Sequence, residues 1–187
     1  MQTGVAGRAL AGGLLVLALA SAACGTSMQM SSEDLSRLTP TEGVVVGSVL
    51  IKGGTDILGR TGWTLIAQRI TSALSSVAPP AVGYRLDASR GGVEEVFVTK
   101  VEAGNYSFVK LAQNGFSTFE AGMNVNFRAQ AGKNVYIGRM IVEFPPGVLV
   151  VGTRFRVKIE DAMETTLISA RQKSGLSLAE VVTDLMN

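Results

Sequence analysis

The chain has 187 residues, 47% of them hydrophobic, and its 17 basic side chains nearly balance its 15 acidic ones. This fits one domain, with or without a tail, and the net charge of +2 provides no basic field for holding a nucleic-acid backbone. With no histidine and a single cysteine, the chain lacks the commonest general base, the commonest metal ligand and the means to form an internal disulfide. We therefore expect a protein that is not an enzyme, has no cofactor or metal, and does not bind nucleic acid.

The N-terminal segment, residues 1–23, predicts a secretory signal peptide. Arg8 is its only charge, and residues 9–20 form an apolar run of Ala, Leu, Gly and Val. A membrane-spanning helix needs about 20 apolar residues, and this run is shorter. We expect the segment to be removed.

The only cysteine follows a run of small residues, Ser21-Ala22-Ala23-Cys24. This pattern resembles the lipobox of bacterial lipoprotein precursors, although that family usually has Leu where this chain has Ser21. The resemblance implies cleavage before Cys24 and a lipid anchor on its sulfur. Gly25, next in the chain, implies sorting to the outer membrane, where the protein would sit on the inner leaflet and face the periplasm. Ordinary secretory cleavage after Ala22 is the alternative, and it would leave Cys24 as a free thiol.

The segment 24–42 is predicted to be a flexible tether that begins at the lipidated Cys24. It is polar and rich in Ser, Thr and Met, it contains Pro40, and it has no sustained apolar period. The folded domain is therefore expected to span residues 43–187.

From Gly43 onward the chain consists of short β-branched and apolar segments separated by turn residues. Seven or eight such strands make the fold mainly β and favour an antiparallel β-sandwich over alternating strands and helices. Residues 71–93, rich in Ser, Ala, Pro and Gly, are expected to be a long connection with only short local structure. The predicted strands cover residues 44–51, 63–68, 93–101, 106–111, 123–129, 134–144 and 148–159.

Two of these segments alternate between apolar and polar residues, which predicts strands with one buried and one solvent-facing side. In the first segment Val125 and Phe127 alternate with Asn124, Asn126 and Arg128, and in the second Phe155, Val157 and Ile159 alternate with Arg154, Arg156 and Lys158.

The C-terminus changes to a helical period. The segments that begin at Asp161 and Ser177 each resemble a capping box, with Glu164 and Glu180 at the fourth position. Two short helices, starting from about residue 161 and separated near Gly175, are therefore expected to cover part of the sandwich.

Two stretches, 102–108 and 132–138, resemble the strand–turn–strand signature of transthyretin-like and carboxypeptidase-regulatory-like β-sandwich domains. The resemblance implies that Gly104 turns a hairpin and that the side chain of Tyr106 packs between the sheets. Such domains often occur in bacterial envelope lipoproteins of undefined function and act mostly as non-catalytic modules, which implies binding or scaffolding.

Candidate binding residues occur at two places. A Gly-rich loop carries Arg60 and leads into Trp63, the only tryptophan, which would suit recognition of a glycan or a peptide; a core position is the alternative for Trp63. The basic stripe of Arg154, Arg156 and Lys158 would suit anionic lipid headgroups or an acidic polymer. Its alternative role is to protect an exposed strand against edge pairing.

Catalysis without histidine would require other chemistry. A serine beside a desolvated lysine could act as a nucleophile, whereas Glu94 and Glu95 are neighbours on a predicted strand and point to opposite faces. The function we expect is a lipid-anchored, non-catalytic structural, assembly or binding module of the cell envelope, with the membrane and envelope proteins or glycans as partners. The alternatives are a periplasmic hydrolase with Ser–Lys or carboxylate chemistry and an accessory subunit of an outer-membrane secretion or polysaccharide-export complex.

Overall fold

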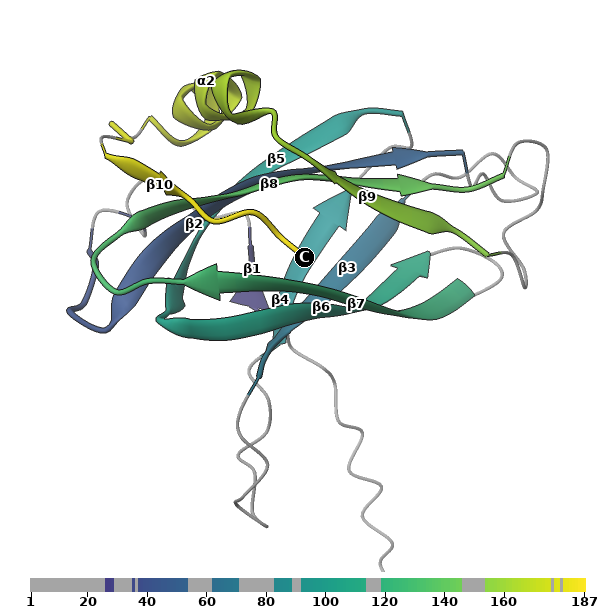
Figure 1. The fold of residues 1–187 in the computed structure, drawn as a ribbon, viewed down its shortest axis with the longest axis horizontal. Coiled ribbons are helices and arrows are strands. Elements are labelled where there is room, and N and C mark those ends of the chain that lie inside the picture. The colour runs from purple at the N-terminus through teal and green to yellow at the C-terminus, as the bar shows by residue number, and fades with distance from the viewer. Residues whose placement is uncertain are drawn as a thin grey trace, which may run out of the picture.

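The computed structural model describes ten stretches of the chain, which form two β-sheets and one helix (Figure 1). The signal segment, Cys24 and Arg60 lie outside the described residues. The described residues are 26–28, 35, 37–53, 62–70, 83–88, 92–113, 119–145, 154–175, 177–178 and 180–187.

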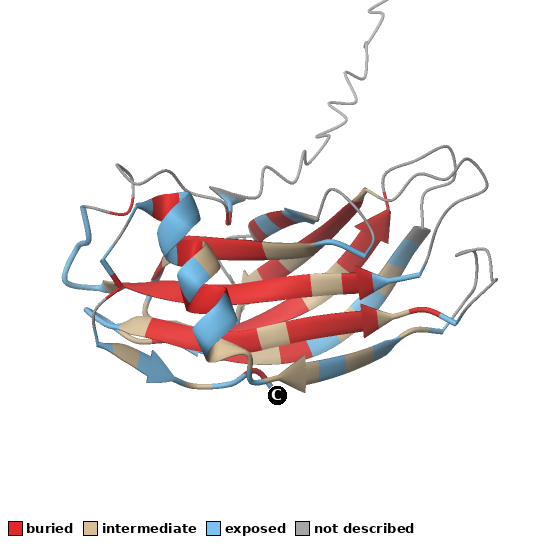
Figure 2. Cartoon of the chain, turned by 90° about the horizontal axis from the view of Figure 1, so that it is seen from above, coloured by how far each residue is buried: buried red, intermediate tan, exposed pale blue. Residues whose placement is uncertain are grey.

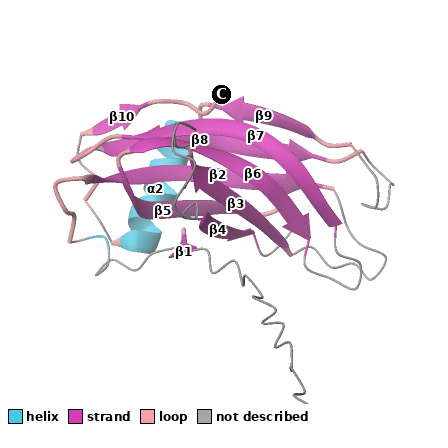
Figure 3. Cartoon of the chain, turned by 90° about the horizontal axis from the view of Figure 1, so that it is seen from below, coloured by secondary structure: helices cyan, strands magenta, loops and turns pink. Residues whose placement is uncertain are grey.

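The first sheet has five strands in the order β1-β4-β3-β6-β7, and Figure 3 shows β1 at its margin beside β4. β1 runs parallel to β4, and every other pair in this sheet is antiparallel. The strands are β1 (Thr26–Ser27), β4 (Gly83–Ala88), β3 (Trp63–Arg69), β6 (Gly104–Gln113) and β7 (Phe119–Ala129).

The second sheet has the order β10-β8-β2-β5, and β9 also pairs with β8. One edge of β8 is filled along its length by β2, so β10 and β9 share the other edge, beside the first and second halves of β8 respectively. The strands are β10 (Val181–Thr183), β8 (Asn134–Glu143), β2 (Glu42–Lys52), β5 (Glu94–Glu102) and β9 (Arg156–Glu160).

The prediction of a mainly β fold is confirmed, but the prediction of purely antiparallel pairing is wrong. β2 and β8 are parallel neighbours in the centre of the second sheet, and β10 is parallel to β8. β2 is covered on both faces, and its residues from Gly43 to Val49 are all buried. A strand buried on both sides reads as a continuous apolar run rather than an alternation, which is the pattern that parallel neighbours commonly show.

The main core lies between the two sheets. Phe97 of β5 meets Phe108 of β6 edge to face, with ring centroids 6.4 Å apart, so side chains of the two sheets are in direct contact. Phe108 also lies 5.1 Å from the ring of Phe127 on β7. Figure 2 shows the buried residues concentrated along the central strands. Aromatic contacts of this kind bury large apolar areas and stabilise the two-sheet arrangement.

A single helix, α2 (Met163–Ser174), covers the outer face of the second sheet and contacts β2, β5 and β8 (Figure 2). The capping box expected at Asp161 is not formed, because the N-cap of the helix is Ala162, which has no side-chain cap hydrogen bond; Asp161 Oδ1 instead accepts a hydrogen bond from the Met163 N–H at 3.1 Å. The helix ends at Gly175, whose left-handed φ of 67° is easily adopted by glycine. Its buried side has Leu167 and Ala170 against Val46 and Val98.

The prediction of a second C-terminal helix is wrong. Residues Val181–Thr183 form β10, which pairs in parallel with Asn134–Tyr136 of β8. These residues are β-branched, and they satisfy the open edge of β8, so the tertiary partner overrides the helical period. Glu180, expected to complete a capping box, has a positive φ of 51°, which a helix does not tolerate.

The connection predicted at 71–93 contains a strand, β4. Tyr84 and Leu86 are buried and Arg85 and Asp87 are exposed, which is the alternation of a half-buried strand. The strand has only six residues and lies among Ser, Ala, Pro and Gly, which masked this alternation in the sequence. β4 pairs with β3 on one side and β1 on the other.

The predicted tether, residues 24–42, belongs to the folded body at two places that the structure describes. These are residues 26–28 and Leu35. Thr26 and Ser27 form β1, and Met28 is 0% exposed within the core between the sheets. Leu35 is 2% exposed and packs with the residues under α2. These are single apolar side chains among polar ones, and they gave no periodic signal in the sequence.

The C-terminal tail connects the two sheets. The N–H groups of Asp184 and Met186 donate to the carbonyls of Tyr136 and Ile137 on β8. Asn187 then exchanges two backbone hydrogen bonds with Asn126 on β7, at 2.7 and 3.1 Å. The tail therefore ties the free edge of the first sheet to β8 of the second.

Candidate functional site

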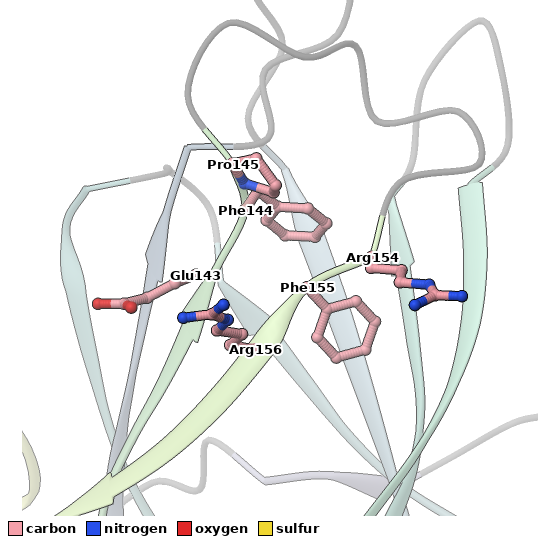
Figure 4. A pocket seen from close by; sticks show the side chains of 6 residues that line it. All are labelled: Glu143, Phe144, Pro145, Arg154, Phe155 and Arg156. Carbon is pink, nitrogen blue, oxygen red and sulfur yellow. The ribbon is translucent and has the colours of Figure 1, made fainter.

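A cleft of about 610 Å³ opens at the end of the molecule where β8 finishes and β9 begins (Figure 4). Figure 4 shows Arg154 and Arg156 on opposite sides of Phe155, with Phe144 and Pro145 above it. A largely apolar floor with a few charged groups at its rim is typical of binding sites. The described residues that line the cleft are Glu143, Phe144, Pro145, Arg154, Phe155 and Arg156.

The alternation in this segment places the arginines outside and the phenylalanine inside. Arg154 and Arg156 are exposed, whereas Phe155 is half-buried and lies against Phe144, with ring centroids 5.6 Å apart. The prediction of one apolar and one basic side for this strand is therefore confirmed. The same holds for β7, where Val125 and Phe127 are buried.

Trp63 is a core residue, so its candidate role on a binding surface is wrong. It is 1% exposed and stacks on Phe144 at 4.9 Å between ring centroids. Because Phe144 also contacts Phe155, Trp63 supports the floor of the cleft from below without reaching a ligand. Its position at the start of β3, facing the second sheet, makes burial more favourable than exposure of so large a ring.

The three residues of the basic stripe are not equally available to a ligand, because the positive charge of Lys158 is paired with the carboxylate of Glu160. Lys158 Nζ donates to Glu160 Oε1 at 2.7 Å. This hydrogen bond raises the pKa of Lys158 and lowers the pKa of Glu160. Within the described part of the chain, by contrast, Arg154 and Arg156 form no ion pair. Of the three residues of the stripe, the two at the cleft therefore have a charge available for an anionic ligand.

One carboxylate lies among these cations. Glu143 is opposite Arg156 in the β8–β9 register, and its Oε1 accepts a hydrogen bond from Lys52 Nζ at 3.4 Å. This local set contains three cations, Lys52, Arg154 and Arg156, and the single carboxylate of Glu143. The net charge of these four side chains is therefore positive. The arrangement can bind an anion through a guanidinium group and an apolar surface through the phenylalanine rings.

The sequence did not identify the aromatic floor. Phe144 was expected only as a strand end, and Phe155 only as a core residue of its strand. The available signal was an aromatic residue placed between two arginines, Arg154-Phe155-Arg156, after a Pro-containing turn. The remaining candidate residues, Cys24 and Arg60, lie outside the described residues.

The opposite end of the body is held together by paired polar groups. The Tyr106 hydroxyl donates to the Glu102 carbonyl at 2.7 Å, and its ring meets Tyr84 edge to face. Arg69 donates to the Glu102 carboxylate and to the Ala103 carbonyl. The resemblance implied that Tyr106 packs between the sheets, and it is 1% exposed within that core. Burial raises the pKa of both tyrosines.

The charged residues considered for catalysis are engaged in ion pairs. Glu94 accepts a two-pronged hydrogen bond from Arg139 at 2.9 and 2.8 Å, and Glu95 pairs with Lys173. Five of the six lysines pair with a carboxylate. In the described ranges, no three Cys, Asp or Glu side chains are placed to hold a metal ion together.

No protein-family model matches the chain, and neither a curated protein nor a solved structure matches it. Among the described residues, no helix has the length and apolar character needed to cross a membrane.

Proposed function

We propose that this protein is a lipid-anchored, non-catalytic binding module of the bacterial cell envelope, built on a β-sandwich related to the transthyretin-like domains. The lipobox-like sequence Ser21-Ala22-Ala23-Cys24 supports the anchor and a place on the inner leaflet of the outer membrane. The binding function depends on one observation: Arg154 and Arg156, without ion pairs in the described part, lie on either side of the Phe155 ring.

The ligand class that fits this cleft is an acidic glycan of the envelope. Guanidinium groups bind carboxylates through two parallel hydrogen bonds, and they would hold acidic substituents at the rim. The rings of Phe144 and Phe155 present an apolar surface to the C–H face of a sugar. A neutral glycan has no acidic groups for the guanidinium groups to bind, so it would contact only the phenylalanine rings.

Binding can be followed through Trp63, because its indole stacks on Phe144 beneath the floor. The probe is an oligogalacturonate, and a neutral galactan oligosaccharide of equal length serves as the comparison. We expect the acidic probe to bind and the double variant Arg154→Ala/Arg156→Ala to lose about tenfold or more in affinity. Lys158→Ala is the matched control, since this cation is on the same strand but already paired with Glu160. Equal binding of both probes, or of wild type and the double variant, would contradict the function.

The anchor is tested separately by fractionation. Cys24→Ser should release the protein from the membrane fraction to the soluble envelope fraction, because the two or more acyl chains of a lipoprotein account for stable membrane attachment. Mass spectrometry of the N-terminal peptide of the wild type should show the lipid on Cys24. An unmodified thiol on that peptide would refute the anchor.

The hydrolase alternative is disfavoured by the lysine ion pairs. A Ser–Lys mechanism requires a desolvated lysine beside a serine, whereas the side chains of Lys52, Lys110 and Lys173 are at least partly exposed and each lies beside a carboxylate. The second alternative, a subunit of a secretion or export complex, would need a contiguous apolar surface. Two of the large exposed apolar side chains of the described part, Ile70 and Leu185, share one hollow. The others are on different elements: Leu38, Val93, Ile168 and Val182.

A further inference from the structure

The strand directions give the body two distinct ends. At one end lie the β5–β6 turn at Ala103, the β7–β8 turn at residues 130–133, and Ile70 after β3; we call this the turn end. The Ile70 N–H donates to the Asn105 carbonyl and the Gly132 N–H to the Glu42 carbonyl, so these segments meet there.

The cleft lies at the other end. β8 leaves the turn end at Asn134 and reaches the cleft at Glu143, and a strand rises about 3.3 Å per residue. Its ten residues therefore separate the two ends by roughly 30 Å. Figure 1 shows β9 starting at the right, far from the turn that joins β7 to β8 at the left.

β1 fixes where the N-terminal segment reaches the body. Thr26 lies beside Tyr84, and β4 starts at Gly83, which is paired with Gln68 near the end of β3. β1 therefore begins on the side of the turn end and runs away from it. Met28, directly after β1, is 0% exposed, so this attachment is part of the fold.

The distance from Cys24 to this attachment is limited by covalent geometry. Cys24 precedes Thr26 by two residues, and each residue spans at most about 3.6 Å. Its backbone can thus lie no more than roughly 7 Å from the start of β1. If the whole segment 24–42 were a flexible tether, the folded body could take any orientation relative to the membrane. A connection of only two residues restricts that orientation.

The turn end carries groups that suit a lipid surface. Ile70 is 52% exposed, and it lines a shallow hollow together with a second exposed apolar side chain, Leu185, one cation, Arg128, and one carboxylate, Asp184. Arg128 and Lys133 are exposed and form no ion pair with any residue that the structure describes. Basic side chains next to a bilayer attract anionic headgroups, and an exposed aliphatic chain can enter the interface.

We propose that the turn end docks on the headgroups of the bilayer that holds the lipid of Cys24, so that the cleft faces away from the membrane. The inference rests on the proposed lipid anchor. It adds a fixed orientation, in which the acidic glycan is bound about 30 Å from the membrane surface.

Two matched labels test this orientation. Ala131 at the turn end and Lys52 at the cleft end are both exposed, and each is replaced by cysteine and carries a nitroxide. The lipidated full-length protein, with its native processing, is placed in phosphatidylcholine and phosphatidylglycerol vesicles that contain a nickel-chelating lipid. We expect strong paramagnetic relaxation of the label at 131 and none at 52, because the nickel lies at the headgroups.

The outcomes separate the orientation from the anchor. Equal relaxation of the two labels on vesicle-bound protein, or stronger relaxation at 52, would overturn the orientation and leave the anchor intact. If the N-terminal peptide has an unmodified thiol and the protein does not associate with the vesicles, the anchor itself fails and the orientation fails with it.

Discussion

The polar groups around Tyr106 at the turn end and those at the rim of the cleft differ in how they are satisfied. At the turn end, the Tyr106 hydroxyl and the Arg69 guanidinium are engaged by the backbone and carboxylate of Glu102. At the cleft, Arg154 and Arg156 have no carboxylate partner among the described residues. A satisfied polar group mainly supports the fold, whereas an exposed unpaired charge contributes little to stability and remains available to a ligand.

The largest effect on stability is expected at Tyr106. Tyr106→Ala should lower the free energy of unfolding by about 3–5 kcal/mol, because it removes a buried ring that stacks on Phe127 and leaves a cavity. Urea unfolding followed by circular dichroism measures the change. A loss below about 1 kcal/mol would mean that this end is not a packed core.

Met28 tests whether the N-terminal segment belongs to the body. Met28→Ala should lower the free energy of unfolding by about 2–5 kcal/mol, since the side chain is fully buried between the sheets. Leu38→Ala, at an exposed position of the same segment, is the control and should change it by less than about 0.5 kcal/mol. Similar changes in the free energy of unfolding for the two variants would support a flexible tether and would remove the basis of the fixed orientation.

Alkaline pH should destabilise the protein through its buried tyrosines. Burial raises the pKa of Tyr84 and Tyr106 above the ordinary value of 10. The folded state then favours the neutral hydroxyls, so their stabilisation is complete below pH 10 and is lost as the pH rises above it. Each tyrosine contributes a slope of up to about 1.4 kcal/mol per pH unit in that range.

Tyr106→Phe provides the control for this pH dependence. It should cost about 1 kcal/mol at neutral pH through loss of the hydrogen bond to the Glu102 carbonyl, and it should flatten the alkaline slope. Urea midpoints measured between neutral pH and pH 11 give both quantities. An unchanged slope in the variant would show that another group causes the alkaline loss.

The smallest effect on stability is expected at the cleft. Arg154→Ala/Arg156→Ala should change the free energy of unfolding by no more than about 0.5 kcal/mol per residue, because both side chains are exposed. The same variant is expected to lose glycan binding, so the two measurements separate recognition from folding. A large stability loss would instead place the arginines in the structural framework.

Local patterns predicted the strands whose two faces differ. The alternation around Phe127 and Phe155 identified the buried sides of β7 and β9. The same kind of pattern in β4 was too short to be recognised. The prediction of a hairpin at Gly104 is wrong, because β5 pairs in the second sheet and β6 in the first, so the turn at Ala103 connects the two sheets. Trp63 was ambiguous because its residue type suits both a core and a binding surface.

Strand pairing and burial of isolated side chains could not be predicted. Val181 and Val182 are strand formers, but they follow a helical period, and only the open edge of β8 decides their conformation. Met28 gives no periodic signal, since a single buried side chain is recognised only by the cavity that it fills.

The sequence by itself determined the mainly β character of this protein, the buried sides of its alternating strands and the basic character of β9, because these depend on residue type and on a period of two. The tertiary structure alone decided that β2 and β8 lie side by side, that Phe144 and Phe155 form a floor between two arginines, and that the N-terminal segment is held at Met28. Each of these is a contact between residues distant in the chain, and no local pattern of residues specifies which distant partner will complete it.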